Sequence, residues 1–144
     1  MKLEVAEKIV AVALAHARSR NMLPLCVAVL DARGATRALA AEDGTSIKRS
    51  NVAIGKAHGA LAMGLGSRTL AKRAETHPHF IAAVTHAVGG SLIPVPGGVL
   101  IRDGEGSLIG AVGVSGDTSD NDEAAAIAAI EAVGLKADPG GTKK

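Results

Sequence analysis

The sequence predicts an α+β domain, in which helices pack on an antiparallel sheet. Two pairs of short apolar segments are each joined by a glycine-containing turn, which is typical of β-hairpins. Helical segments precede, separate and follow these pairs, so strands and helices do not alternate as they do in parallel sheets. The length of 144 residues suits one domain. We therefore expect a single domain over residues 1–137 and a flexible tail over residues 138–144.

The first predicted element is an amphipathic helix over residues 3–20. Apolar residues recur along it at helical spacing, and the same stripe carries His16. Pro24 lies just beyond the end of this helix. Two strands are expected to follow, over residues 25–31 and 36–41, with a glycine-containing turn between them.

A long helix is expected next, capped by Thr45 or Ser46 and ending near Met63. Helical spacing places Lys56 beside small apolar residues on the buried side of this helix. Gly64 and Gly66 are expected to end the helix. We expect three further segments before the second hairpin, a short charged helix or loop, a turn and a short helix, over residues 67–75, 76–79 and 80–87.

The stretch from residue 94 to residue 116 is rich in glycine and predicts the second hairpin. A tight turn at Gly97 and Gly98 leads into strands over residues 99–102 and 107–115. Both faces of the second strand are apolar, so we expect it to be covered on both sides. Its glycines remove side chains where another backbone or a ligand comes close, so both a packed hairpin and a pocket wall fit the pattern.

Acidic residues gather before the last predicted helix, which ends near Val133. Asp120 is the predicted cap of this helix, and Asp117, Asp122 and Glu123 surround it. These carboxylates either complement the helix dipole or form the acidic rim of a pocket.

Composition excludes several classes of protein. The net charge is only +2, and Phe80 is the sole aromatic residue, which argues against a nucleic-acid-binding protein. Cys26 is the sole cysteine, which excludes an intrachain disulfide and a cysteine zinc site. The sequence has no apolar run of about 20 residues and no secretory leader pattern, so we expect a cytoplasmic protein without membrane contact. A core of small side chains favours a homo-oligomer.

Histidines are the first candidates for chemistry. His77 and His79 have the spacing of metal ligands, with His58 or His86 as a further ligand, but we expect solvated loop histidines and no metal site. His16 lies on an apolar stripe, where it is either a core or interface histidine or an axial ligand of haem.

Lys56 is the second candidate. A half-buried lysine can act as a base when its pKa is lowered, or it can hold a ligand carboxylate. Its alkyl chain can equally lie along the apolar surface while the ammonium group reaches solvent.

Several short motifs occur in one order along the chain. They are Asp31-x-x-Gly34, Asp43-Gly44, Ala53-Ile-Gly-Lys56-Ala57, Pro96-Gly97-Gly98, Gly104, Gly110-Ala-Val-Gly-Val-Ser-Gly116 and Asp120-Asn-Asp-Glu-Ala124. In these motifs the sequence resembles the GlcG/HbpS-like family, whose domain is also found as the C-terminal part of PduO proteins. The resemblance extends from the first helix to Val133.

This resemblance implies a profilin-like fold with a central antiparallel sheet of about five strands, and a compact homo-oligomer that is often an octamer. Some members of the family bind haem, one group accompanies corrinoid metabolism, and others accompany the catabolism of glycolate and other small organic acids. In similar PduO-type domains a histidine of the first helix ligates haem, and His16 is the position that matches it here.

Two hypotheses for function follow. The first is a protein that binds a small molecule or a tetrapyrrole, with haem as the implied cofactor and no cofactor as the alternative. The second is a cofactor-independent isomerase, lyase or hydrolase that acts on a small organic acid or enone; a structural or regulatory oligomer without a ligand is a third reading. The predicted ligand-binding residues are His16, Lys56, Gly97, Gly98, Ser115, Gly116 and Asp122. For an enzyme, the predicted catalytic residues are Lys56, Asp43 and Glu42, and the amides of Gly97 and Gly98 would hold a developing oxyanion.

Overall fold

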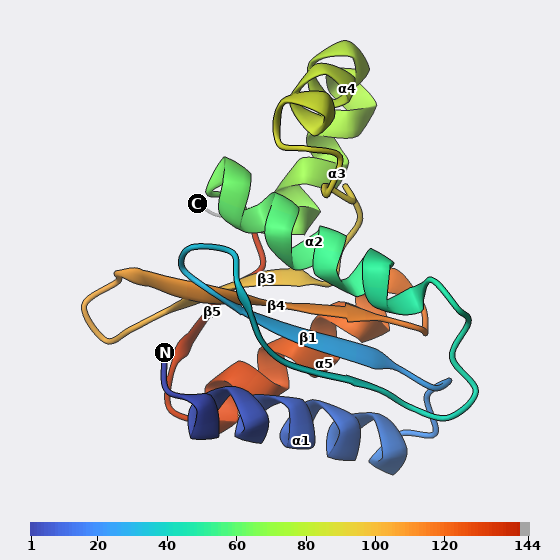
Figure 1. The fold of residues 1–144 in the computed structure, drawn as a ribbon, viewed down its shortest axis with the longest axis vertical. Coiled ribbons are helices and arrows are strands. Elements are labelled where there is room, and N and C mark those ends of the chain that lie inside the picture. The colour runs from blue at the N-terminus through green and yellow to red at the C-terminus, as the bar shows by residue number, and fades with distance from the viewer. Residues whose placement is uncertain (142–144) are drawn as a thin grey trace.

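A five-stranded antiparallel sheet forms the centre of the molecule, which confirms the predicted fold class (Figure 1). The computed structural model describes residues 1–141. The strands lie in the order β2-β1-β4-β3-β5, and neighbouring strands pair antiparallel. In chain order the elements are α1 (Leu3–Ser19), β1 (Cys26–Asp31), β2 (Thr36–Ala41), α2 (Arg49–Met63), α3 (Ser67–Thr76), α4 (Pro78–Ala87), β3 (Gly98–Arg102), β4 (Leu108–Ser115), α5 (Ser119–Ala132) and β5 (Lys136–Asp138).

Helices cover both faces of the sheet. Helices α1 and α5 lie side by side on one face, and α2 crosses the other (Figure 1). The main core lies between the sheet and the pair α1 and α5, where Ile9, Val27, Val112 and Ile130 are fully buried. Every residue of β1 is buried because this strand is covered on both faces, and β4 is buried from Gly110 onward for the same reason.

Glycines permit a close approach of α2 to the sheet. A Cβ atom on Gly113 would overlap the carbonyl of Ala53, and one on Gly98 would overlap the carbonyl of Lys56. The predicted close approach at the hairpin glycines is therefore an approach of backbone to backbone at these two positions.

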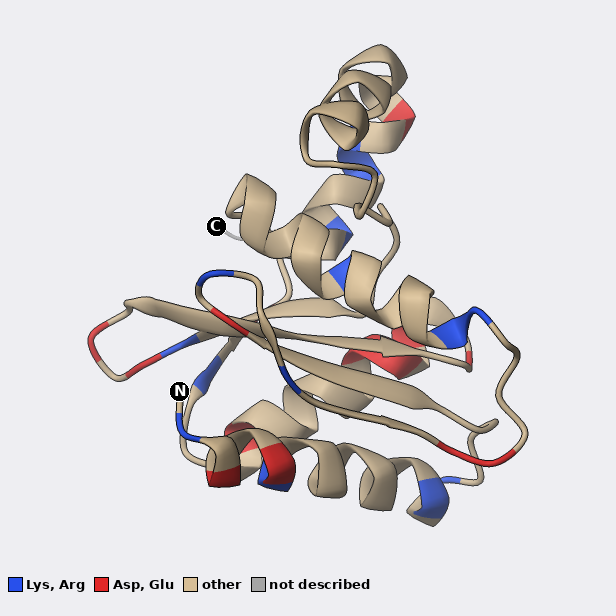
Figure 2. Cartoon of the chain, in the orientation of Figure 1, with Lys and Arg blue, Asp and Glu red and all other residues tan. Residues whose placement is uncertain are grey.

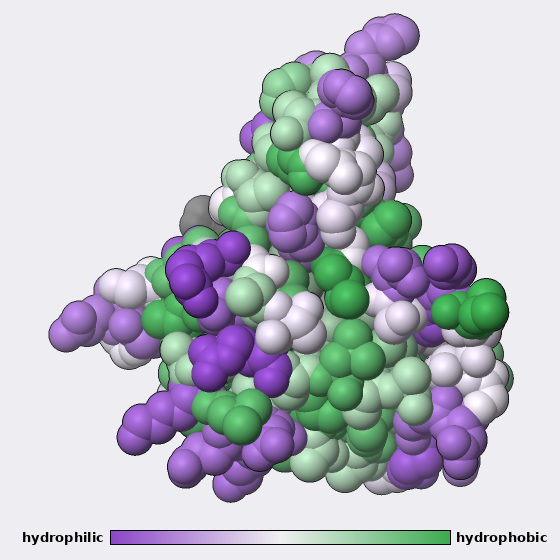
Figure 3. Space-filling model, viewed as in Figure 1, coloured by the Kyte–Doolittle hydropathy of each residue, from purple (hydrophilic) through white to green (hydrophobic). Residues whose placement is uncertain are grey.

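Helices α3 and α4 form an arm that projects away from the sheet (Figure 1). Helix α4 packs mainly on α3, and Ile81 is its one buried residue. Phe80, on the same helix, leaves 46% of its surface exposed. Hydrophobic and hydrophilic residues are mixed over the visible face of this arm (Figure 3).

Two helix starts differ from the predictions. Helix α2 begins at Arg49 with Lys48 at its N-cap, so Thr45 and Ser46 do not cap it. The Thr45 hydroxyl instead donates to the carbonyl of Glu42 within the preceding turn, at 3.0 Å. Helix α5 is capped by Thr118, whose hydroxyl accepts from the Asn121 amide at 3.2 Å, and not by Asp120.

The chain also departs from prediction at two other places. Pro78, expected in a turn, is the first residue of α4, where its missing amide proton has no consequence for helix bonding. Strand β5 was not predicted, and Asp138, the first residue of the predicted tail, pairs with Leu100 in it. The Gly141 amide donates to Thr69 Oγ1 at 2.7 Å, while residues 142–144 of the predicted tail lie outside the described residues.

Over the 141 described residues, no helix combines the length and the apolar character that crossing a bilayer requires.

Candidate functional site

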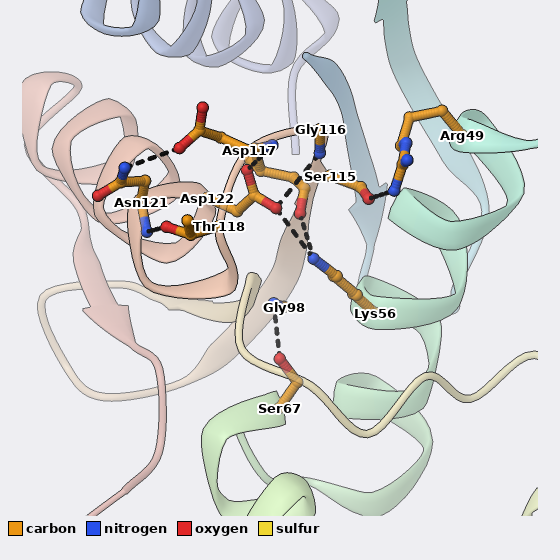
Figure 4. Close-up of polar contacts among 11 residues, drawn as sticks. Arg49, Lys56, Ser67, Gly98, Ser115, Gly116, Asp117, Thr118, Asn121 and Asp122 are labelled. Atoms are coloured by element: carbon orange, nitrogen blue, oxygen red, sulfur yellow. Dashed lines mark hydrogen bonds and ion pairs between the residues drawn. The ribbon is translucent and has the colours of Figure 1, made fainter. Parts of the chain in front are cut away.

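Lys56 and Asp122 form a buried ion pair between α2 and α5 (Figure 4). Lys56 Nζ lies 3.2 Å from Asp122 Oδ2 and donates to the carbonyl of Val114 at 2.9 Å. The two residues are only 2% and 1% exposed. Asp122 also accepts backbone hydrogen bonds from Asp117, at 2.9 Å, and from Gly116, at 3.3 Å. The pair therefore joins α2, the end of β4 and the start of α5.

Burial acts on both members of this pair. It lowers the pKa of the Lys56 ammonium, and the Asp122 charge opposes that change. It raises the pKa of the Asp122 carboxyl, and the Lys56 charge opposes that change in turn, with help from the backbone hydrogen bonds. Each charge compensates for the lost hydration of the other. Because the Lys56 ammonium group bonds to Asp122 and to the carbonyl of Val114, it points into the protein and not toward a ligand.

The predicted glycine site lies around this pair, but its polar groups bond within the protein. A Cβ on Gly97 would lie 2.9 Å from Lys56 Nζ. The Gly98 amide donates to Ser67 Oγ at 2.7 Å, and the Gly116 amide donates to Asp122 Oδ2. The structure thus brings Lys56, Gly97, Gly98, Gly116 and Asp122 together as sequence reasoning grouped them, and their contact with a ligand stays a prediction.

Sequence reasoning missed two side chains of this cluster, Ser67 and Arg49. Ser67 is fully buried and accepts from Gly98, while Arg49 Nη1 donates to the hydroxyl of Ser115 at 3.0 Å (Figure 4). Ser115 itself is 1% exposed. No local pattern marked either residue, because each reaches its partner across a large separation in sequence.

Glu42 and Asp43 lie elsewhere, at a hollow of about 440 Å³ that is also lined by Arg18 and Pro24. Glu42 pairs with Arg18 Nε at 2.9 Å and accepts from the Leu25 amide at 2.7 Å. These contacts hold the turn after β2 against α1, and none of them involves Lys56. A shared catalytic role for these acids and Lys56 stays a prediction.

His16 lies half-buried on α1 and lines a second hollow of about 470 Å³. The other lining residues are Arg20 and Met22, and Asn121 and Ala124 of α5. Burial, and to a smaller extent the charge of Arg20, lowers the pKa of the His16 imidazole. The ring is therefore neutral at neutral pH, the form in which histidine binds metals. Between residues 1 and 141, no hydrogen bond involves the His16 ring.

The remaining histidines do not gather into a metal site. The His58 Nδ1 atom lies 2.8 Å from the carbonyl of Ser91, and His77 Nδ1 lies 2.8 Å from Thr76 Oγ1. Throughout the described chain, no three His, Cys, Asp or Glu side chains are placed to hold a metal ion.

The molecule is a small α+β domain built on one antiparallel sheet with helices on both faces. It carries a hollow lined by a histidine beside α1. The chain belongs to the HbpS-like family: the family model described as "Haem degrading protein HbpS-like" matches residues 1–131. The resemblance to GlcG/HbpS-like proteins seen in the sequence is thereby confirmed.

Solved structures share this fold over nearly the whole chain. A PduOC:haem complex is 23% identical with a TM-score of 0.83, over 94% of this chain and 96% of that one. HbpS is 27% identical with a TM-score of 0.80, over 93% and 90% of the two chains. The Klebsiella pneumoniae protein ORFY is 23% identical with a TM-score of 0.81, over 91% and 88%. A search of curated proteins gave no significant match.

Proposed function

We propose that the protein binds haem and that His16 is the axial ligand of the iron. The observation that carries the proposal is a neutral imidazole, bonded to no other described residue, in a hollow between two helices. Membership of a family described by haem degradation supports it, as does the fold shared with a protein solved as a haem complex.

The hollow has the size of a small-molecule site and offers some apolar contact. Its volume of about 470 Å³ lies within the range of roughly 300–1,000 Å³ that is typical of small-molecule sites. Met22 and Ala124 offer apolar contact, and Met22 is largely buried. His16 would hold the iron through a ring nitrogen, and bound haem would supply redox and ligand-binding chemistry there.

A haemin titration with His16→Ala tests the proposal. We expect the unsubstituted protein to give a stoichiometric Soret shift, and the variant to lose that shift or bind about tenfold more weakly or worse. His86→Ala is the matched control, because His86 is exposed on α4 and lies outside the hollow.

Circular dichroism should show that both variants remain folded. An identical Soret response from all three proteins would contradict axial ligation by His16. The absence of any specific shift in the unsubstituted protein would contradict haem binding itself.

The alternative of an enzyme that acts through Lys56 has less support. A catalytic base must reach the proton that it removes, whereas Lys56 Nζ is buried and bonded to Val114 and Asp122. Binding of a corrinoid or of a small organic acid remains the alternative that the same hollow would serve, and a titration with those ligands would reveal it.

We also propose that the chain forms a homo-oligomer, as the family resemblance implies. The projecting arm supports this, because the Phe80 ring stands half exposed on a helix that packs mainly on α3. A second copy that covers this face would remove the ring from water.

A further inference from the structure

We propose that Arg20 binds a propionate of the tetrapyrrole and makes the His16 hollow selective for porphyrins with free carboxylates. The proposal rests on the haem-binding function above and assigns a separate task to a separate residue. His16 would recognise the metal, and Arg20 would recognise the acidic edge of the ring system.

Helix geometry places the two side chains together. Arg20 is the C-cap residue of α1 and follows His16, which lies in the last turn of the helix, by four positions. Both line the same hollow. The middle of α1 carries no lysine, arginine or acidic residue (Figure 2). The C-terminal end of the helix is cationic, with Arg18 in the last turn and Arg20 at the C-cap.

Most N–H donors of the Arg20 guanidinium group make no hydrogen bond within the described residues. Its one side-chain hydrogen bond within residues 1–141 runs from Nη1 to the hydroxyl of Ser19, at 3.1 Å. Several other arginines, unlike Arg20, are paired with carboxylates: Arg18 with Glu42, Arg68 with Glu123 and Arg102 with Asp138. No carboxylate of the described chain lies within ion-pairing distance of Arg20, and a guanidinium can bind a carboxylate through two parallel hydrogen bonds.

Within the described chain, the α5 side of the hollow offers no cation to a carboxylate. Asn121, which lines this side, donates its amide to Asp117 Oδ2 at 2.7 Å. Hydrogen bonds from the Leu23 amide and from Asn121 lower the pKa of Asp117, so this residue is charged at neutral pH. Asp117 does not itself line the hollow, but its charge disfavours a negative ligand edge on the α5 side, whereas Arg20 attracts one on the α1 side.

Comparing haemin with its dimethyl ester tests the proposal, because esterification removes the carboxylate charges and keeps the iron. We expect the unsubstituted protein to bind haemin about three- to tenfold more tightly than the ester, as suits a partly exposed charge-assisted pair. In Arg20→Gln this ratio should fall close to one. Lys8→Gln removes the same charge from an exposed position on the same helix and should keep the ratio.

The outcomes separate the two proposals. A ratio that is unchanged in Arg20→Gln, with a Soret shift that still depends on His16, overturns the role of Arg20 and leaves haem binding intact. A Soret response that is the same with and without the His16 imidazole overturns both the role of His16 and the role of Arg20. Arg20→Lys should restore only part of the ratio, because lysine lacks the planar pair of donors, and full restoration would overturn the two-bond geometry.

Discussion

At the scale of single residues, Lys56 and Asp122 show that a charged side chain in a core depends on a partner. The pair is almost fully enclosed, and Asp122 also receives two backbone amides. Removing either member leaves a buried charge without compensation, which costs far more free energy than an exposed ion pair contributes.

We predict that Lys56→Met lowers the free energy of unfolding by about 3–5 kcal/mol. The partly exposed ion pair of Arg102 and Asp138 provides the control. Arg102→Gln should lower the free energy of unfolding by no more than about 1 kcal/mol. Urea denaturation of the three proteins measures both effects. Equal losses in the two variants would contradict a special role for the buried pair.

Part of this pair could be predicted from the sequence. Helical spacing placed Lys56 on the buried side of its helix, because that inference needs only neighbours along the chain. The identity of its partner could not be predicted, because Asp122 lies 66 residues away and the contact depends on how α5 meets β4. His16 was predicted as a candidate ligand-binding residue for the same local reason. The residues of α5 that line its hollow could not be predicted, because they reach it only through the tertiary structure.

At the scale of secondary-structure elements, the start of a helix depends on how the preceding turn is bonded as well as on which residues could cap it. Thr45 and Ser46 both suit an N-cap by residue type, but the Thr45 hydroxyl donates to Glu42. Asp120 suits a cap as well, but it lies in the first turn of α5, where it pairs with Arg68. The sequence therefore predicted both helices, and their starts were wrong by a few residues.

Thr118→Ala should lower the free energy of unfolding by about 1 kcal/mol, because the Asn121 amide loses its acceptor. Ser46→Ala serves as the matched control and should change stability by no more than about 0.5 kcal/mol. Thermal unfolding monitored by circular dichroism can compare the two. A larger loss in the Ser46 variant would contradict the helix starts described here.

Strand β5 shows a different limit of prediction. It has three residues, Lys136–Asp138, and none of them has strong strand preference. Its formation depends on pairing with β3 and on the ion pair of Asp138 with Arg102. Such a strand follows from the tertiary structure and leaves no periodic pattern in the sequence.

At the scale of the whole molecule, the sheet with its three covering helices forms the body, and the arm of α3 and α4 extends from it (Figure 1). The arm is joined to the body near its base, where Arg68 of α3 pairs with Glu123 of α5 at 2.9 Å. Hairpin order and helix order were sufficient to predict the fold class of the body. The projection of the arm could not be predicted, because its apolar residues fit a buried helix equally well.

We predict that Phe80→Asp shifts the protein toward smaller assemblies while its secondary structure is kept. The ring is already 46% exposed in the single chain, so a charge there disfavours burial against a second copy more than it disturbs the fold. Sedimentation velocity measures the change. His79→Asp, at the exposed neighbouring position on α4, is the control and should disturb assembly less. Identical sedimentation of all three proteins would contradict an interface at Phe80.

Phe80 is the sole aromatic residue, and this decides which optical methods suit the molecule. With no tryptophan or tyrosine in the chain, the protein contributes almost nothing to near-ultraviolet absorption or fluorescence. Bands in that region during a titration would belong to the added chromophore alone. In Phe80→Trp the new indole would be the sole emitter in the molecule. The wavelength of its emission would show directly whether the tip of the arm is in water or against another surface.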